Sequence, residues 1–191
     1  MNIDDLTQLV IDAAMEIETA NLEQALEETS PQQINEFNAT GDTLLMVAAG
    51  FENISVVKLL LSRGADVSIA NDIGCTALWG PVYNMEIAQL LIDAGADVNA
   101  QNVSGGSILM YAAFMSRSEF LELLIAHGAH VNHRNKMGRT ALMKATIAGS
   151  ERCVQILLDA GANKEINSIE GETARDIAIE KGFYKIADML K

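Results

Sequence analysis

The sequence predicts an all-α solenoid of stacked helix-turn-helix units with β-hairpin loops between them. Three observations predict it: glycines recur at intervals of 31 or 33 residues, a hydroxyl-bearing residue follows each of them, and a leucine-rich segment separates them. A fixed period of this length is typical of repeat architectures, in which each unit buries its apolar face against its neighbours. The 191 residues, of which 49% are hydrophobic, suffice for one short array with a substantial core.

Each unit begins with a glycine that is followed two positions later by threonine or serine. Glycine adopts positive φ without steric strain, which suits the tip of a hairpin. A threonine or serine hydroxyl accepts hydrogen bonds from backbone amides, so we expect it to N-cap the short helix that follows. The five pairs are Gly41 and Thr43, Gly74 and Thr76, Gly105 and Ser107, Gly138 and Thr140, and Gly171 and Thr173.

Two helices follow in each unit. The first is rich in alanine, as in MVAAG and MYAAF, and its small side chains let it lie close to its neighbours. The second is rich in Leu, Ile and Val, as in VVKLLL and IAQLLI, which gives it a wide apolar stripe. A further glycine ends this second helix and suits the left-handed conformation common at that point. These glycines are Gly64, Gly95, Gly128 and Gly161.

This pattern resembles that of the ankyrin-repeat family, and the resemblance covers almost the whole chain. The segments that carry it are GDTLLMVAAG…LLLSRGADVS, GCTAL…LLIDAGADVNA, GGSILMYAA…LLIAHGAHVN and GRTALMKATIAG…LLDAGAN. The family's Thr-Pro-Leu-His motif is replaced throughout, for example by TLLM and TALW, so its histidine is missing. The resemblance implies one ankyrin-repeat domain over residues 1–191. Its parts are an N-terminal cap at 1–37, repeats at 38–70, 71–101, 102–134 and 135–167, and a C-terminal capping repeat at 168–191.

Within the N-terminal cap, the sequence predicts helices near residues 5–17 and 21–29, with Pro31 in the loop that leaves the cap. The C-terminal segment GETARDIAIEKGFYKIADMLK places charged residues on its outer face. Polar outer faces on terminal repeats keep a solenoid soluble.

The repeat at 71–101 is irregular. It is two residues shorter than its neighbours, and its first helix reads TALWGPVYN. Pro81 lacks an N–H group and disfavours helical conformation at Gly80, where glycine itself costs roughly 1 kcal/mol. We therefore expect a single helical turn or irregular chain, with Trp79 or Tyr83 displaced toward the groove. The deletion is either tolerated without a role or forms a notch that a partner fills.

The resemblance implies that a protein partner binds in the concave groove, at the hairpin tips and the exposed ridge of the first helices. Large apolar side chains at these positions are typical of interface hot spots. Alternatively, some of them fold inward between repeats and belong to the core. The tips run from acidic near the N-terminus to basic at Lys136 and Arg139, which would orient a dipolar partner. The predicted partner-binding residues are Asp42, Phe51, Asp72, Ile73, Trp79, Tyr83, Phe114, Met115, Met137, Arg139 and Ile147.

Charge is distributed unevenly along the chain, whose formal net charge is −13. Residues 1–116 carry 16 acidic and two basic side chains, whereas residues 117–191 carry 10 acidic and 11 basic ones. The acidic half is either a well-solvated surface or steers a partner with a basic surface. The second interpretation supports an alternative function, a dedicated inhibitor or immunity-type protein that occludes a basic enzyme or nucleic-acid-binding protein. Nucleic acid and anionic membrane are disfavoured as direct partners.

No motif in the sequence indicates catalysis. Phosphate-binding, dinucleotide-binding and hydrolase motifs are absent, and neither Cys75 nor Cys153 has neighbours that suggest a thiolate nucleophile. We therefore expect a non-catalytic protein without a cofactor. The cluster of His127, His130 and His133 invites a metal site or a pH-dependent switch. In the repeat register they fall at a helix end, a loop and the next hairpin, so we predict no metal site.

The chain has no apolar run of the ~18–20 residues that a membrane helix needs. Its first residues include two aspartates where a secretory signal would carry basic residues, so we expect a cytoplasmic protein. We also expect the protein to be monomeric when free. The segments GADVNA and GAHVNH resemble sites of asparagine hydroxylation in ankyrin repeats of animal cells. Otherwise, Asn99 and Asn132 serve their own hairpins as turn asparagines.

Overall fold

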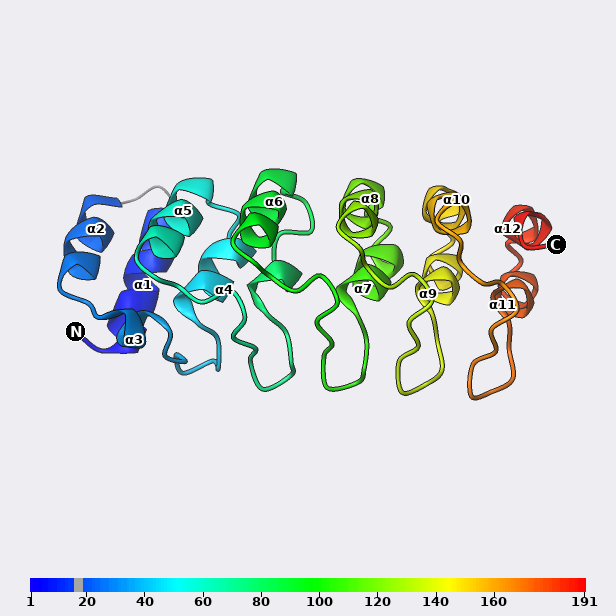
Figure 1. Ribbon diagram of the computed structural model, residues 1–191, viewed down its shortest axis with the longest axis horizontal. Helices are drawn as coiled ribbons and strands as arrows, with labels where there is room; N and C mark the ends of the chain where they lie inside the picture. Colours follow the sequence, from blue (N-terminus) through cyan, green and yellow to red (C-terminus); the bar gives the residue numbers. More distant parts are fainter. Residues whose placement is uncertain (16–18) are drawn as a thin grey trace. The chain divides into compact units, whose positions relative to one another are not determined.

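The computed structural model describes residues 1–15 and 19–191 (Figure 1). These residues form two compact units, Met1–Asp97 and Val98–Lys191. The described residues contain helices and no strand, which confirms the predicted all-α class. The first unit carries 16 acidic and two basic side chains and the second carries 10 acidic and 11 basic ones, so their net charges are −14 and +1. No helix in the described ranges combines the length and apolar character needed to span a membrane.

The first unit holds the N-terminal helices and two further helix pairs. In it, α1 packs against α2 and α4, and α4 packs against α5 and the one-turn helix η1. Leu6, Val10, Leu22 and Leu45 are fully buried between these helices. The elements are α1 (Ile3–Ala14), α2 (Thr19–Glu27), α3 (Pro31–Ile34), α4 (Leu44–Gly50), α5 (Ile54–Ser62), the 3₁₀ helix η1 (Ala77–Trp79) and α6 (Met85–Asp93).

The second unit consists of three helix pairs. The first helices of the pairs pack side by side, α7 on α9 and α9 on α11, and the second helices form a layer beside them (Figure 1). Phe120, Leu124 and Leu157 are fully buried. The elements are α7 (Ile108–Phe114), α8 (Ser118–Ala126), α9 (Ala141–Ile147), α10 (Glu151–Asp159), α11 (Ala174–Glu180) and α12 (Tyr184–Met189).

The predicted N-caps form at four of the five first helices. The hydroxyls of Thr43, Ser107, Thr140 and Thr173 each accept a hydrogen bond from the amide three residues on, at 3.2–3.4 Å. The prediction is wrong at Thr76. In the single 3₁₀ turn, the Trp79 amide that a capping hydroxyl would bind donates instead to the Thr76 carbonyl, at 3.1 Å. The buried Thr76 hydroxyl therefore has no hydrogen-bond partner within the described residues.

The N-terminal region differs from the prediction in two ways. Helix α1 begins and ends earlier than expected, and residues 16 and 17 of the predicted helix lie outside the described residues. Pro31 begins the short helix α3 rather than lying in a loop. Ser30 and Gln33 form a capping box, in which the Gln33 amide donates to the Ser30 hydroxyl and the Ser30 amide to the Gln33 side chain. Proline suits the first position of a helix because it has no amide to leave unpaired.

The hairpin loops share one local geometry. In each, a residue three positions before the tip glycine donates its amide to the carbonyl one position after that glycine, at 2.9–3.0 Å. Within the described residues, Gln101 and Ser107 form an isolated antiparallel bridge at the base of one loop. All five tip glycines have positive φ, between +68° and +81°, as predicted. The donating residues are Asn38, Asn71, Asn102, Asn135 and Ser168.

A second set of asparagines ties each of three loops to the next repeat. The Asn132 side chain accepts from the Asn163 amide at 2.7 Å and donates to the Gly161 carbonyl at 3.1 Å. Asn99 makes the same two bonds to the next repeat, as does Asn35. We call this two-bond link an asparagine clasp. The sequence left two interpretations of Asn99 and Asn132, a site of asparagine hydroxylation or a turn asparagine of its own hairpin. The hydrogen bonds given above join both side chains to the following repeat.

Ser68 takes the clasp position in the repeat at 38–70. A serine lacks the amide arm that the clasp requires, and its hydroxyl donates to Asp66 of its own repeat at 2.6 Å. Because adjacent repeats stabilise one another through their interfaces, this junction lacks a contribution that its counterparts have.

Replacing Ser68 by asparagine is expected to raise the free energy of unfolding by about 1–2 kcal/mol, since each added hydrogen bond contributes roughly 0.5–1.5 kcal/mol. Urea denaturation followed by circular dichroism measures the change. The reverse substitution, Asn132→Ser, is the matched control and should lower stability by a similar amount. A Ser68→Asn protein with an unchanged unfolding midpoint would contradict the prediction.

The irregular repeat adopts the predicted single turn, η1. Gly80 follows it and lies close to α4, because a Cβ atom at Gly80 would be 3.0 Å from the Ala49 carbonyl carbon and the Gly50 nitrogen. Glycine thus lets the shortened segment approach the α4 backbone. Trp79 is half-buried, and the Tyr83 side chain is 60% exposed.

Candidate protein-binding surface

The predicted partner-binding residues lie on hairpin tips and at the ends of first helices, and both compact units contribute. The first unit holds Asp42, Phe51, Asp72, Ile73, Trp79 and Tyr83, and the second holds Phe114, Met115, Met137, Arg139 and Ile147.

Three large apolar side chains of the first unit are open to solvent. Phe51 caps the C-terminus of α4, Ile73 lies at a hairpin tip and Tyr83 follows η1; their exposed fractions are 48%, 59% and 60%. These three residues do not belong to the core, which was the alternative interpretation. Aromatic residues are enriched at the centres of protein interfaces, so Phe51 and Tyr83 are candidate contact residues.

Acidic side chains accompany this apolar group. Asp42 accepts a hydrogen bond from the Asn71 side chain at 2.8 Å, and the Asp72 carboxylate lies 3.8 Å from where a Cβ of Gly41 would be. The carboxylates of Asp42 and Asp72 therefore stand on adjacent hairpin tips. Burial, and then the Asp42 charge, raise the pKa of the Cys75 thiol, which keeps this cysteine protonated and weakly nucleophilic.

The two basic side chains of the first unit belong to its second-helix layer. Lys58, on α5, pairs with Glu86 of α6 at 2.9 Å, and Arg63 caps the C-terminus of α5. Neither therefore neutralises the carboxylates on the hairpin tips.

In the second unit, an aromatic side chain and a lysine share one surface. The Lys144 ammonium lies 5.4 Å from the centre of the half-exposed Phe114 ring, within the range of a cation–π contact. Burial lowers the pKa of Lys144, and the nearby Arg139 lowers it further. Met115 and Ile147 are half-buried, and Met137 is exposed at a tip. Lys144 was not among the predicted residues.

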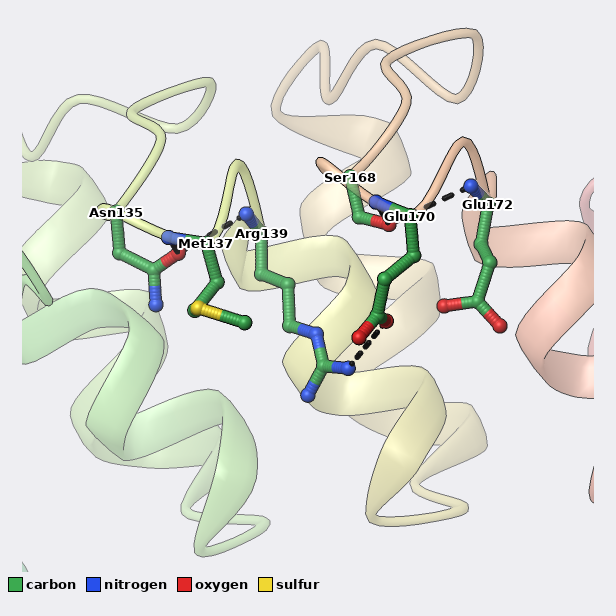
Figure 2. Close-up of polar contacts among 6 residues, drawn as sticks. All are labelled: Asn135, Met137, Arg139, Ser168, Glu170 and Glu172. Atoms are coloured by element: carbon green, nitrogen blue, oxygen red, sulfur yellow. Dashed lines mark hydrogen bonds and ion pairs between the residues drawn. The ribbon is translucent and has the colours of Figure 1, made fainter.

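Arg139 is held in an ion pair rather than left as a free charge. Its guanidinium lies 3.0 Å from the Glu170 carboxylate on the next hairpin (Figure 2). The Asn135 side chain accepts hydrogen bonds from the amides of Met137 and Arg139, and so fixes the tip that carries both. Because the negative Glu170 carboxylate offsets the positive charge of Arg139, the local electrostatic potential is less positive than the sequence suggested.

Two exposed tip residues were missed. Val103 and Ile169 are 57% and 63% exposed, and they occupy the same position relative to the tip glycine as Asp72 and Lys136 do. The repeat register was the signal that could have found them. A pocket beside Phe51 was also missed; Gly50 borders it and leaves open space where a side chain would stand.

The three clustered histidines make separate contacts. The Nδ1 atom of His127 lies 2.9 Å from the Leu123 carbonyl, and the Nε2 atom of His133 lies 2.7 Å from the Gly105 carbonyl. The His130 backbone takes part in an asparagine clasp. Across residues 1–15 and 19–191, no three His, Cys, Asp or Glu side chains are grouped as metal ligands.

The sequence matches the family profile described as "Ankyrin repeats (3 copies)" over residues 10–102, 82–168 and 109–191. Together these overlapping matches extend from residue 10 to the last residue. A comparison with curated proteins finds no significant match.

Proposed function

Because the chain belongs to the ankyrin-repeat family, whose domains are generally protein–protein interaction modules and typically non-catalytic, we propose that it binds a protein partner through its hairpin tips and first-helix ends. One observation carries the proposal: large apolar side chains are exposed at these positions in both units. They are Phe51, Ile73, Tyr83, Phe114 and Met137. Aromatic residues and methionine are enriched where interfaces are most tightly packed.

Binding of this kind needs no covalent chemistry. The repeats supply a scaffold whose tips are fixed by their own hydrogen bonds, as at Asn135, so little order has to be gained on association. Affinity would then come from a few buried anchors, and charge would set orientation and association rate.

Affinity capture from a lysate of the source organism, followed by mass spectrometry, tests the proposal. We expect the wild-type protein to capture one stoichiometric partner. The Tyr83→Asp/Phe114→Asp variant should bind it at least about thirty-fold more weakly, since an interface hot spot contributes ~2 kcal/mol or more. Titration with the purified partner measures the two affinities.

The control carries the same added charge on the other helix layer. Ser62→Asp/Gln155→Asp places one aspartate on α5 and one on α10, both at exposed positions, and should bind the partner as the wild type does. Circular dichroism shows whether each variant is folded. Equal binding by the two double variants would contradict the proposed surface.

The charge of the first unit, −14, favours a second candidate function. In this alternative the protein inhibits its partner by covering a basic active site or nucleic-acid-binding cleft with the acidic unit. Affinity would then fall steeply as salt is added, because exposed charges are screened. The partner's activity would be lost at one equivalent of inhibitor, whereas a partner bound by an adaptor would remain active.

A further inference from the structure

A pocket of about 400 Å³ lies in the first unit beside Phe51. Thr7 and Ile11 of α1 form one wall, and Met46, Val47 and Gly50 of α4 form another. The loop that contains Asp42 borders its rim. The inference developed from this pocket rests on the proposed function and narrows it to one recognition site.

The pocket is larger than its counterpart in the second unit, of about 230 Å³, where Glu180 occupies the position that Gly50 holds here. Gly50 lies seven residues after the capping residue Thr43, and the same position holds Phe114, Ile147 and Glu180 in other repeats. A Cβ atom at Gly50 would have no atom within 4 Å. The residue is helical and lies outside the positive-φ region, so neither backbone conformation nor close packing requires glycine there.

Most of the surface that lines the pocket is apolar. Its hydroxyl groups are already engaged, since Thr7 donates to the Ile3 carbonyl and Thr40 donates to the Asn38 side chain. A polar occupant would therefore lose contacts with water and gain few hydrogen bonds in return. An aliphatic or aromatic side chain, in contrast, would bury its surface against Ile11 and Phe51.

The negative charge at the rim favours a particular type of residue next to that apolar side chain in the partner. Asp42 is the one charged residue that lines the pocket within the described part of the chain, and Asp72 stands on the adjacent tip. As the two bases of this unit belong to α5 and its C-terminus, neither neutralises the carboxylates of Asp42 and Asp72. A neighbouring lysine or arginine would complement them.

We propose that this pocket receives an apolar side chain from an extended segment of the partner protein, and that a lysine or arginine next to that side chain pairs with Asp42. The recognised feature is thus a short basic and apolar sequence. The pocket supplies the anchor, and the acidic tips supply orientation.

Selection from a phage-displayed library of random dodecapeptides against the full chain tests this proposal. We expect the selected peptides to carry an apolar residue adjacent to lysine or arginine. Gly50→Phe fills the pocket with the side chain that Phe114 provides in its own repeat. It should weaken binding of these peptides at least about ten-fold in fluorescence polarisation, a change of roughly 1.4 kcal/mol.

Two matched controls accompany the test. Gln155→Phe adds the same aromatic group on exposed α10 and should leave peptide affinity unchanged. Asp42→Asn keeps the oxygen that accepts from Asn71 but removes the charge, and should weaken binding several-fold more than Asp159→Asn does.

Three results would overturn the proposal: peptides that bind Gly50→Phe as tightly as wild type, peptides without a basic residue beside the apolar one, or no binding peptide at all. Its failure is distinguishable from that of the proposed function. Peptides or a partner that tolerate Gly50→Phe but are lost in Tyr83→Asp/Phe114→Asp would retain the binding function and reject the pocket.

Discussion

Replacing Phe120 by alanine is expected to lower the free energy of unfolding by about 3–5 kcal/mol, the usual cost of truncating a buried aromatic residue. Phe120 lies on α8 and is the largest fully buried side chain in the described part of the chain. Its removal leaves a cavity that the adjoining helices cannot fill without moving. Since a domain of this size is stable by roughly 5–15 kcal/mol, the loss is a large fraction of the total.

Urea denaturation monitored by circular dichroism measures this effect, with Phe51→Ala as the matched control. Phe51 is half-exposed at the end of α4, so its truncation should cost no more than about 1 kcal/mol. An equal loss of unfolding free energy at the two positions would mean that the Phe120 side chain contributes no more to the core of its unit than an exposed one does.

Replacing Gly138 by alanine is expected to cost about 2–4 kcal/mol, for two reasons that add. Its φ of +68° strains any residue with a Cβ atom, which costs roughly 1–2 kcal/mol. In addition, the new Cβ would lie 2.8 Å from Arg134 Nη2 and 3.0 Å from the Ile169 nitrogen. The arginine can move, but the Ile169 amide is held by its hydrogen bond to the Met137 carbonyl.

Gly171→Ala separates these two contributions. Gly171 is also a tip glycine, with φ of +81°, but a Cβ there would have no atom within 4 Å. Its replacement should therefore cost only the backbone strain, about 1–2 kcal/mol. Differential scanning calorimetry of the two variants gives the comparison. A Gly138→Ala protein that melts at or above the temperature of Gly171→Ala would show that the neighbouring loop yields.

The regular part of the fold was predictable because the same residue types recur at the same positions of the repeats. A tip glycine, a capping hydroxyl and an apolar stripe depend on short-range chemistry, which can be recognised in sequence. Thr76 shows where this reasoning fails. Its position is correct for a cap, but the single 3₁₀ turn uses the Trp79 amide for a backbone bond, so the hydroxyl has no hydrogen-bond partner among the described residues.

The candidate surface was only partly predictable. The repeat register placed Phe51, Ile73 and Tyr83 at positions that the structure leaves exposed. It could not show that Arg139 pairs with Glu170, because that contact joins residues 31 positions apart through their side-chain rotamers. The pocket beside Gly50 was harder to predict, because its lining comes from α1, α4 and a hairpin loop that only the folded unit brings together.

The serine at the clasp position has a consequence for the way the protein unfolds. In a linear array, the balance between a repeat's own stability and its coupling to the next determines whether the repeats melt together. The junction after Ser68 lacks the asparagine clasp, and the repeat that follows has only one turn in place of its first helix. Coupling at this junction therefore lacks the contribution that Asn35 makes at the preceding one. We therefore expect partly folded states, in which the repeats on the two sides of this junction separate before the whole first unit is lost.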